Sequence, residues 1–310
     1  PDDAQEAIQH FTAAVEQNPA DALAWAGLAL CYVTLGHNAM ISDPDLWSQG
    51  QSAAERAIRL DSTVAEGWAA LADYETYWGR NWEKAERAFH KANELNPSLA
   101  WNHYHYAWYL ALFGRVEEAV AEHERAKALD PLTHYHTTWL PALYWWSRDF
   151  ERAYAEAKEV LEDYPDNVTA LLVFGRSAAL VGSFDESIAV AEQLVALDSS
   201  FLDGLGEAYA LAGRREEALR IAREMEAREN AGSPGAIYAI LGFRDESLEW
   251  LEKAEGFALP WIWADPETDA ARDDPRFQAV FRRMNLRFEP GQLEPVAIPV
   301  DEPERSGGTG

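Results

Sequence analysis

The stretch PSLAWNHYHYAWYLALFGRVEEAVAEHERAKALDP, residues 97–131, decides the fold. It holds two helical patterns separated by Gly114 and Arg115, and the first pattern is rich in aromatic side chains. The closing proline recurs 34 residues later as Pro165, and Ser199 takes the same place after another 34. A fixed period of this length with two helices in each unit predicts an all-α solenoid of stacked antiparallel helix pairs.

The same frame extends to both sides of this stretch, with local departures. The second unit carries an insertion of nine residues near 36–45, and the third is one residue longer than the period. In the fifth unit, Arg148 replaces the turn glycine and Pro141 falls inside the first helix, which we expect it to kink. The frame of the second and third units is carried by Trp25, Leu28, Tyr32, Trp68, Leu71 and Gly79.

These patterns predict three regions. Residues 1–257 form the solenoid, with a partial first unit followed by about seven helix pairs, and residues 258–286 form capping helices. Residues 287–310 are rich in Pro and Gly and are expected to be a flexible tail. Residues 3–18 read as a second helix without its partner, which leads us to expect that the chain is a piece of a longer protein.

With these repeats in view, the chain resembles bacterial tetratricopeptide-repeat (TPR) proteins from residue 3 to about 255. The segments LGFRDESLEWLEKA and DPRFQAVFRRMNL resemble the end of TPR arms fused behind bacterial effector domains. Those effectors are winged-helix regulators, adenylate cyclases and Ser/Thr kinases. The resemblance implies a right-handed TPR solenoid with a C-terminal cap, whose first helices line a concave surface.

Composition excludes several classes of function. The net charge is −27, from 53 acidic and 26 basic residues, which argues against binding nucleic acid or anionic membranes. The surplus of acidic residues fits either an ordinary solvated surface or a basic partner. No apolar run is long enough for membrane insertion, and the polar start lacks a signal peptide, so we expect a cytoplasmic location. The single cysteine, Cys31, excludes an internal disulfide and is expected to be buried.

The concave positions that the resemblance implies supply the candidate partner-binding residues. On the fourth unit, three of them are spaced i, i+3 and i+7 and therefore share one helix face. Exposed aromatic residues there would form an adhesive groove, since Trp and Tyr dominate interface hot spots. The alternative is that they fill the interior of the array or pack against the tail. The candidates are Trp101, Tyr104, Trp108, Tyr135, Thr138 and Trp145, with Asp73 and Arg176 flanking them.

Other chemistries find no support in the sequence. At the positions where TPR proteins hold a chaperone carboxylate, only Arg176 is basic. The histidine pairs at 103 and 105 and at 134 and 136 are two residues apart, unlike the i, i+4 spacing that chelates a metal. There is no nucleophile elbow, phosphate loop or zinc-protease motif. We therefore expect no enzyme activity, no metal and no cofactor.

Three functional hypotheses follow. The preferred one is a non-enzymatic scaffold that binds a protein or peptide, either basic or aromatic and apolar, in the concave groove. The first alternative is a sensory or regulatory arm of a larger effector protein. The second is a structural subunit that forms a homo-oligomer through its own tail.

Overall fold

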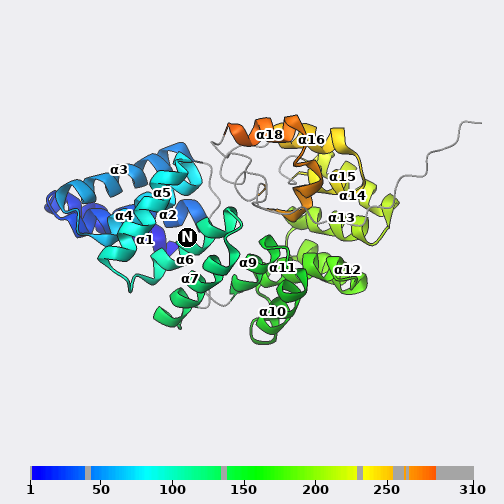
Figure 1. Ribbon diagram of the computed structural model, residues 1–310, viewed down its shortest axis with the longest axis horizontal. Coiled ribbons are helices and arrows are strands. Elements are labelled where there is room, and N and C mark those ends of the chain that lie inside the picture. The colour runs from blue at the N-terminus through cyan, green and yellow to red at the C-terminus, as the bar shows by residue number, and fades with distance from the viewer. Residues whose placement is uncertain are drawn as a thin grey trace, which may run out of the picture. The chain divides into compact units, whose positions relative to one another are not determined.

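The computed structural model describes residues 2–38, 43–133, 138–228, 233–253, 262 and 265–283. Internal contacts divide the chain into two units. Among the described residues, the first unit comprises 2–133 with Ile262, and the second comprises 138–253 with 265–283. The helices of each unit follow one another in pairs (Figure 1).

The first unit is built from three helix pairs that follow one leading helix. Helix α2 packs against α3, α4 against α5, and α6 against α7, while α1 packs against α2. The elements are α1 (Asp2–Gln17), α2 (Ala22–Asn38), α3 (Pro44–Leu60), α4 (Ala65–Tyr74), the π-helix η1 (Glu75–Gly79), α5 (Trp82–Leu95), α6 (Ala100–Leu112) and α7 (Val116–Leu129).

The second unit continues the pairing and ends in a closing helix. First helices also pack on the next first helix, as α11 does on α13 and α13 on α15. The predicted all-α fold of antiparallel helix pairs is confirmed. The elements are α9 (Leu140–Trp146), α10 (Phe150–Asp163), α11 (Val168–Leu180), α12 (Phe184–Leu197), the 3₁₀-helix η2 (Ser199–Phe201), α13 (Leu202–Leu211), α14 (Arg215–Ala227), α15 (Gly235–Ile240), α16 (Arg244–Lys253), the 3₁₀-helix η4 (Pro266–Ala271) and α18 (Pro275–Arg282).

Alanines recur where helices cross. Ala85, Ala119 and Ala153 occupy the same place in three successive second helices, and all three are 0% exposed. Two helices approach to about 8 Å only where the side chains between them are short. The 34-residue period of the sequence therefore reflects positions at which two helices cross closely.

From the α4–α5 pair onward, the turn inside each described pair contains a left-handed residue. Gly114 (φ +69°) and Gly182 (φ +87°) adopt this conformation without strain, and Arg148 (φ +65°) replaces glycine between them as the spacing indicates. The sequence predicts Gly79 at the turn of the third repeat, but the left-handed residue there is Arg80 (φ +53°). The extra residue of the third repeat is accommodated in η1, because the hydrogen bonds of a π-helix span one residue more than those of an α-helix.

Pro141 lies just after an interruption of the helical structure, since Thr138 is helical and Trp139 is in a turn. Helix α9 begins at Leu140, so Pro141 lies in its first turn. A proline is tolerated there because the amide that it lacks would have no partner within the helix. Helix α9 itself has seven residues, and the predicted kink stays a prediction because residues 134–137 lie outside the described part of the chain.

The insertion in the second repeat, which belongs to the first unit, ends at a helix cap. Asp43 accepts a hydrogen bond from the Asp45 amide, and Pro44 is the first residue of α3. Residues 39–42 lie outside the described part of the chain. Cys31 on α2 is partly exposed rather than fully buried, and burial raises the pKa of its thiol.

Helix α18 begins with the same Asp-Pro cap as α3. Asp274 accepts a hydrogen bond from the Arg276 amide, and Pro275 opens α18. The three predicted regions stay a prediction, and the tail at 287–310 lies outside the described residues. Within the described segments, no helix has the length and apolar character needed to cross a bilayer.

Candidate functional site

The aromatic stripe predicted on α6 is not an exposed surface. Tyr104 is 6% exposed and Trp108 is 1% exposed, while Trp101 is half-buried. Their burial has a simple cause, since every residue from 102 to 112 is buried and a helix that is covered on all sides has no outward stripe. The expected exposure of Tyr104 and Trp108 is therefore wrong, and the alternative that they fill the array fits their burial. Their role in partner binding stays a prediction.

The remaining candidates are distributed over both units. Thr138 and Trp145 are buried in the second unit, where the Trp145 ring lies 5.2 Å from the Phe150 ring. Tyr135 lies outside the described residues. Asp73 belongs to the first unit, where it contacts His105, and Arg176 belongs to the second, where it pairs with Glu207.

Asp73 forms a buried pair with a histidine of α6. Its Oδ1 lies 2.8 Å from Nδ1 of His105, and the Trp101 ring stacks on the imidazole at a centroid distance of 3.8 Å. Burial raises the pKa of Asp73, and the nearby His105 opposes this only in part. The two groups tie α4 to α6 through a polar contact inside an apolar layer.

The neighbouring histidine has an equivalent partner. The Nδ1 atom of His103 lies 2.5 Å from Glu122 on α7, and its Nε2 lies 3.0 Å from the carbonyl oxygen of Pro97. His103 and His105 thus bind carboxylates on opposite sides of α6. In the part of the chain that the structure describes, no three His, Cys, Asp or Glu side chains are grouped to hold a metal ion.

Asp73→Asn is expected to change how stability depends on pH. Because the pKa of Asp73 is raised on folding, ionising it in the folded state costs stability, and this cost grows as the pH rises above the ordinary value of 3.8. The melting temperature of the Asn variant should therefore gain on that of the wild type as the pH rises toward neutrality. Thermal unfolding of both proteins in a His105→Gln background measures this without imidazole titration, and a constant difference would contradict it.

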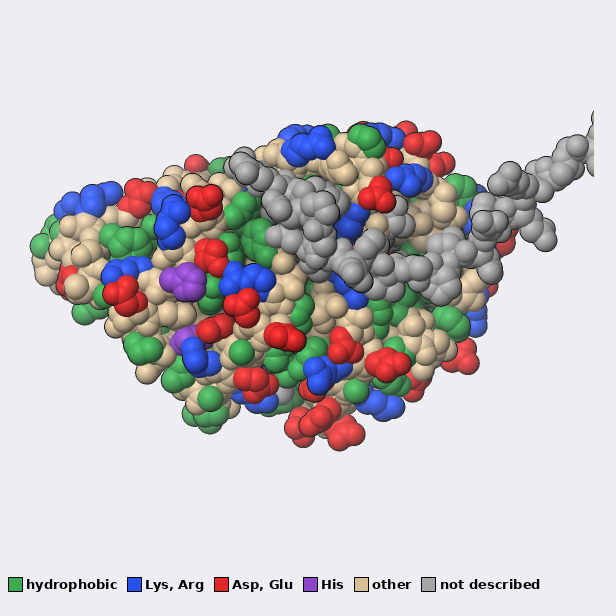
Figure 2. Space-filling model, in the orientation of Figure 1, with side chains coloured by type: hydrophobic (Ala, Val, Ile, Leu, Met, Phe, Trp, Pro, Cys, Tyr) green, Lys and Arg blue, Asp and Glu red, His purple; other side chains and the backbone are tan. Residues whose placement is uncertain are grey.

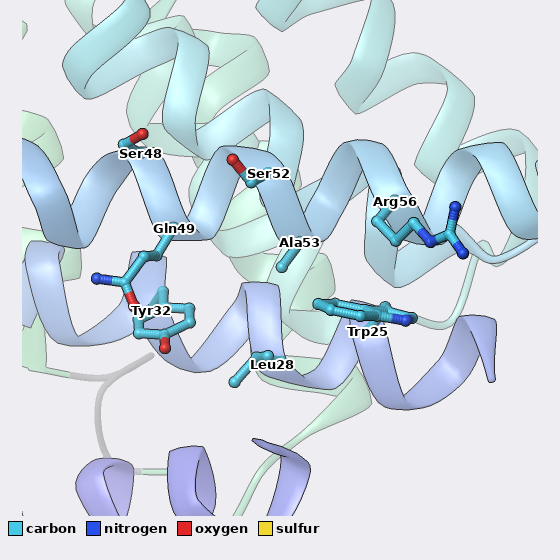
Figure 3. Close-up of a pocket in the computed structure, with 8 residues that line it drawn as sticks. All are labelled: Trp25, Leu28, Tyr32, Ser48, Gln49, Ser52, Ala53 and Arg56. Carbon is cyan, nitrogen blue, oxygen red and sulfur yellow. The ribbon is translucent and has the colours of Figure 1, made fainter. Parts of the chain in front are cut away.

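The first unit has a pocket of about 360 Å³ between α2 and α3. Helix α2 supplies Trp25, Leu28 and Tyr32, whose i, i+3 and i+7 spacing places them on one face. Figure 3 shows these side chains along α2 on one side of the pocket, with Arg56 of α3 beside the Trp25 ring. Helix α3 supplies Ser48, Gln49, Ser52, Ala53 and Arg56.

The pocket combines an apolar wall with an available cation. Trp25 donates its indole N–H to the carbonyl oxygen of Pro19 at 3.1 Å, and Gln49 donates to the carbonyl oxygen of Asp45 at 3.2 Å. Arg56 is exposed, and no described carboxylate lies within ion-pair distance of it. The sequence frame placed Trp25, Leu28 and Tyr32 correctly on a helix but did not reveal the pocket. The available signal was the row of polar residues at 48, 52 and 56, which share a face of α3.

Arg176 on α11 is surrounded by carboxylates of the second unit. Its side chain lies 3.2 Å from Glu207, 3.6 Å from Asp203 and 3.7 Å from Asp265. Two of these acids come from α13 and the third precedes η4. A residue predicted to meet a partner is thus already paired within the chain.

Solved structures match this arrangement of helices. A tetratricopeptide-repeat protein from Parabacteroides merdae superposes with a TM-score of 0.57 and 13% identity, over 82% of this chain and 99% of that one. This chain has the TPR fold. The type IV pilus biogenesis factor PilW matches the TPR array with a TM-score of 0.53 and 20% identity, over 65% of this chain and 93% of PilW. Yeast Tom70 matches with a TM-score of 0.52 and 16% identity, over 90% of this chain and 62% of Tom70.

Sequence relatives cover shorter parts of the TPR array. The transcriptional regulator HilA of Salmonella typhimurium is 25% identical over 144 residues, which is 43% of this chain and 26% of HilA. The Hsp70-Hsp90 organizing protein 2 of Arabidopsis thaliana is 29% identical over 93 residues, which is 30% of this chain and 14% of that protein. The chain therefore spans about a quarter or less of the length of these relatives. No protein-family model matches it.

Proposed function

We propose that this chain is a non-enzymatic protein-interaction scaffold that holds a peptide segment of a partner protein in the pocket between α2 and α3. The observation that carries the proposal is the combination of Trp25, Tyr32 and Arg56 around one hollow. These three residue types are the ones most enriched among interface hot spots. A TPR fold alone would not specify a binding position, because fold does not determine function.

The chemistry of the pocket favours one kind of segment. An apolar side chain of the partner would bury against Trp25 and Leu28, and an adjacent carboxylate would pair with Arg56. On the face of the molecule shown in Figure 2, acidic side chains are scattered among basic and uncharged ones, and acidic residues outnumber basic ones in the sequence, 53 to 26. Basic residues flanking the partner's apolar and acidic pair would therefore be attracted by the net charge of −27.

Arg56→Glu tests the proposal. Peptides selected from a displayed library on the immobilised chain should carry an apolar residue next to Asp or Glu, and the substitution should weaken their binding about tenfold by opposing that carboxylate. Arg59→Glu is the matched control, because Arg59 lies on the same helix and pairs with Glu55 outside the pocket. Fluorescence anisotropy with the selected peptides provides the measurement. Equal binding to the wild type and the Arg56 variant would reject this site.

The predicted aromatic residues call for a different variant. A joint change of Trp101, Tyr104 and Trp108 to Ala would remove two buried rings and is expected to destabilise the unit itself. Trp101→Ala alone changes the half-buried member of the set. We retain Trp101 as a proposed contact, to be examined by the same peptide assay.

A second candidate function rests on the similarity to HilA. That protein is a transcriptional regulator, and 144 of its residues align with this chain. We therefore propose, as the alternative, that the chain is a regulatory arm of a larger effector protein. Sequencing the gene upstream of the codon for Pro1 tests it, because an effector domain in the same reading frame is the expected result. A chaperone carboxylate clamp is not proposed, since Arg176 is surrounded by Asp203, Glu207 and Asp265.

A further inference from the structure

Arg148 connects two distant parts of the second unit. Its Nε and Nη2 atoms donate to the two carboxylate oxygens of Asp269 at 3.0 and 2.6 Å, across 121 residues of sequence. Arg272 donates to the same carboxylate at 2.5 Å. All three side chains are buried, with exposed fractions of 6%, 0% and 5% for Arg148, Asp269 and Arg272.

A second arginine, Arg176, lies close to the start of the segment that contains Asp269. Asp265 lies 3.7 Å from Arg176 on α11, and it precedes Asp269 by four residues. The 3₁₀-helix η4, which contains Asp269, packs against α15. The acidic segment 265–272 therefore touches the turn after α9, helix α11 and helix α15, all of which are first helices of their pairs or adjoin one.

The segment is held by different forces from those that hold α18. Its described buried apolar residues are only Pro266 and Ala271, whereas α18 buries Phe277, Val280 and Phe281. The 3₁₀ geometry of η4 is also a weak local structure over six residues. Ion pairs anchor the segment and apolar packing anchors the helix that follows it.

We propose that segment 265–272 occupies a binding surface for acidic peptides and blocks it until a partner displaces it. The partner is a protein segment that presents two carboxylates four residues apart, as Asp265 and Asp269 are. Such a segment replaces both carboxylates, so the buried guanidinium group of Arg148 is not left without a counter-ion, while Arg176, which is 26% exposed, also keeps Asp203 and Glu207. This surface lies in the second unit, so the proposal is independent of the α2–α3 pocket.

The internal segment has an advantage that a partner must overcome. Tethering gives it a high effective concentration, in the millimolar range for short flexible linkers. The acidic peptide should therefore bind the wild type weakly and bind well once the internal carboxylates are removed. That difference makes the contact measurable.

The test uses the full chain and a fluorescent peptide with the sequence of residues 265–275, DPETDAARDDP. The Asp265→Asn/Asp269→Asn protein should bind it at least about tenfold more tightly than the wild type does. The matched peptide with Asn at both positions should bind neither protein. Adding Arg148→Met and Arg176→Met to the double variant should abolish binding. In the wild type, excess acidic peptide should speed amide exchange of 265–272 and leave α18 protected.

Three results would overturn the proposal. The first is a folded double variant, with unchanged helical circular dichroism, that binds the acidic and Asn peptides equally or not at all. The second is loss of helical structure in the double variant, which would make the segment an obligatory part of the fold. The third is a dimer of the wild type formed by exchange of this segment between copies, which would identify a second chain as the occupant.

Discussion

Trp47→Ala is expected to lower the free energy of unfolding of the first unit by about 3–5 kcal/mol. The Trp47 side chain is 0% exposed, and its ring stacks on Trp78 at a centroid distance of 6.0 Å. Gly36 is packed so closely that a Cβ there would lie 2.8 Å from the Trp47 ring. Alanine would leave a cavity between α2 and α3 that these neighbours cannot close.

Urea unfolding followed by circular dichroism measures this loss. Ser48→Ala is the matched control, because Ser48 is the next residue of α3 and is exposed. Its free energy of unfolding should stay within about 0.5 kcal/mol of the wild type. A Trp47 variant as stable as the Ser48 variant would show that the α2–α3 pair does not depend on this ring.

Phe277→Ala is expected to have a similar effect on the second unit, about 3–5 kcal/mol. Phe277 is 0% exposed and its ring lies 4.6 Å from that of Phe281, on the helix that packs against α16. Stability in a repeat array is a sum over neighbours, and the end repeats need a cover. Losing this ring should therefore open α15 and α16 before the pairs that precede them.

Hydrogen exchange resolved by peptide distinguishes this local loss from a global one. Protection should fall first in residues 235–253, while α11 and α12 keep theirs. Arg282→Ala, an exposed change on the same helix, should leave protection unchanged. Uniform loss across the unit would mean that the cap and the repeats unfold together.

The fold could be predicted because its requirements repeat at fixed spacing. Close helix crossings require short side chains, as at Ala85 and Ala119, which are 34 residues apart. The turns favour residues that adopt the left-handed conformation, as Gly114 and Gly182 do at a separation of 68 residues, or two periods. Arg148 keeps the same spacing and takes the left-handed conformation although it is not glycine.

The candidate site could not be predicted to the same degree. Helical spacing places Trp101, Tyr104 and Trp108 on one face, but it does not say whether that face is covered. The carboxylate partner of His105 is Asp73, on a different helix pair, and helical spacing does not indicate such a partner. The contact of Arg148 with Asp269 spans 121 residues, and no local pattern reports such a pairing.

The π-helix at Glu75–Gly79 has a consequence for how this array tolerates change. The third repeat is one residue longer than the period, yet the left-handed turns at 80, 114, 148 and 182 keep the spacing of 34 residues. The surplus residue is stored as a widened turn inside a helix instead of as a longer loop. Single insertions in such an array can therefore be neutral to every later repeat, so that length variation between homologous arrays need not mark a change of surface loops.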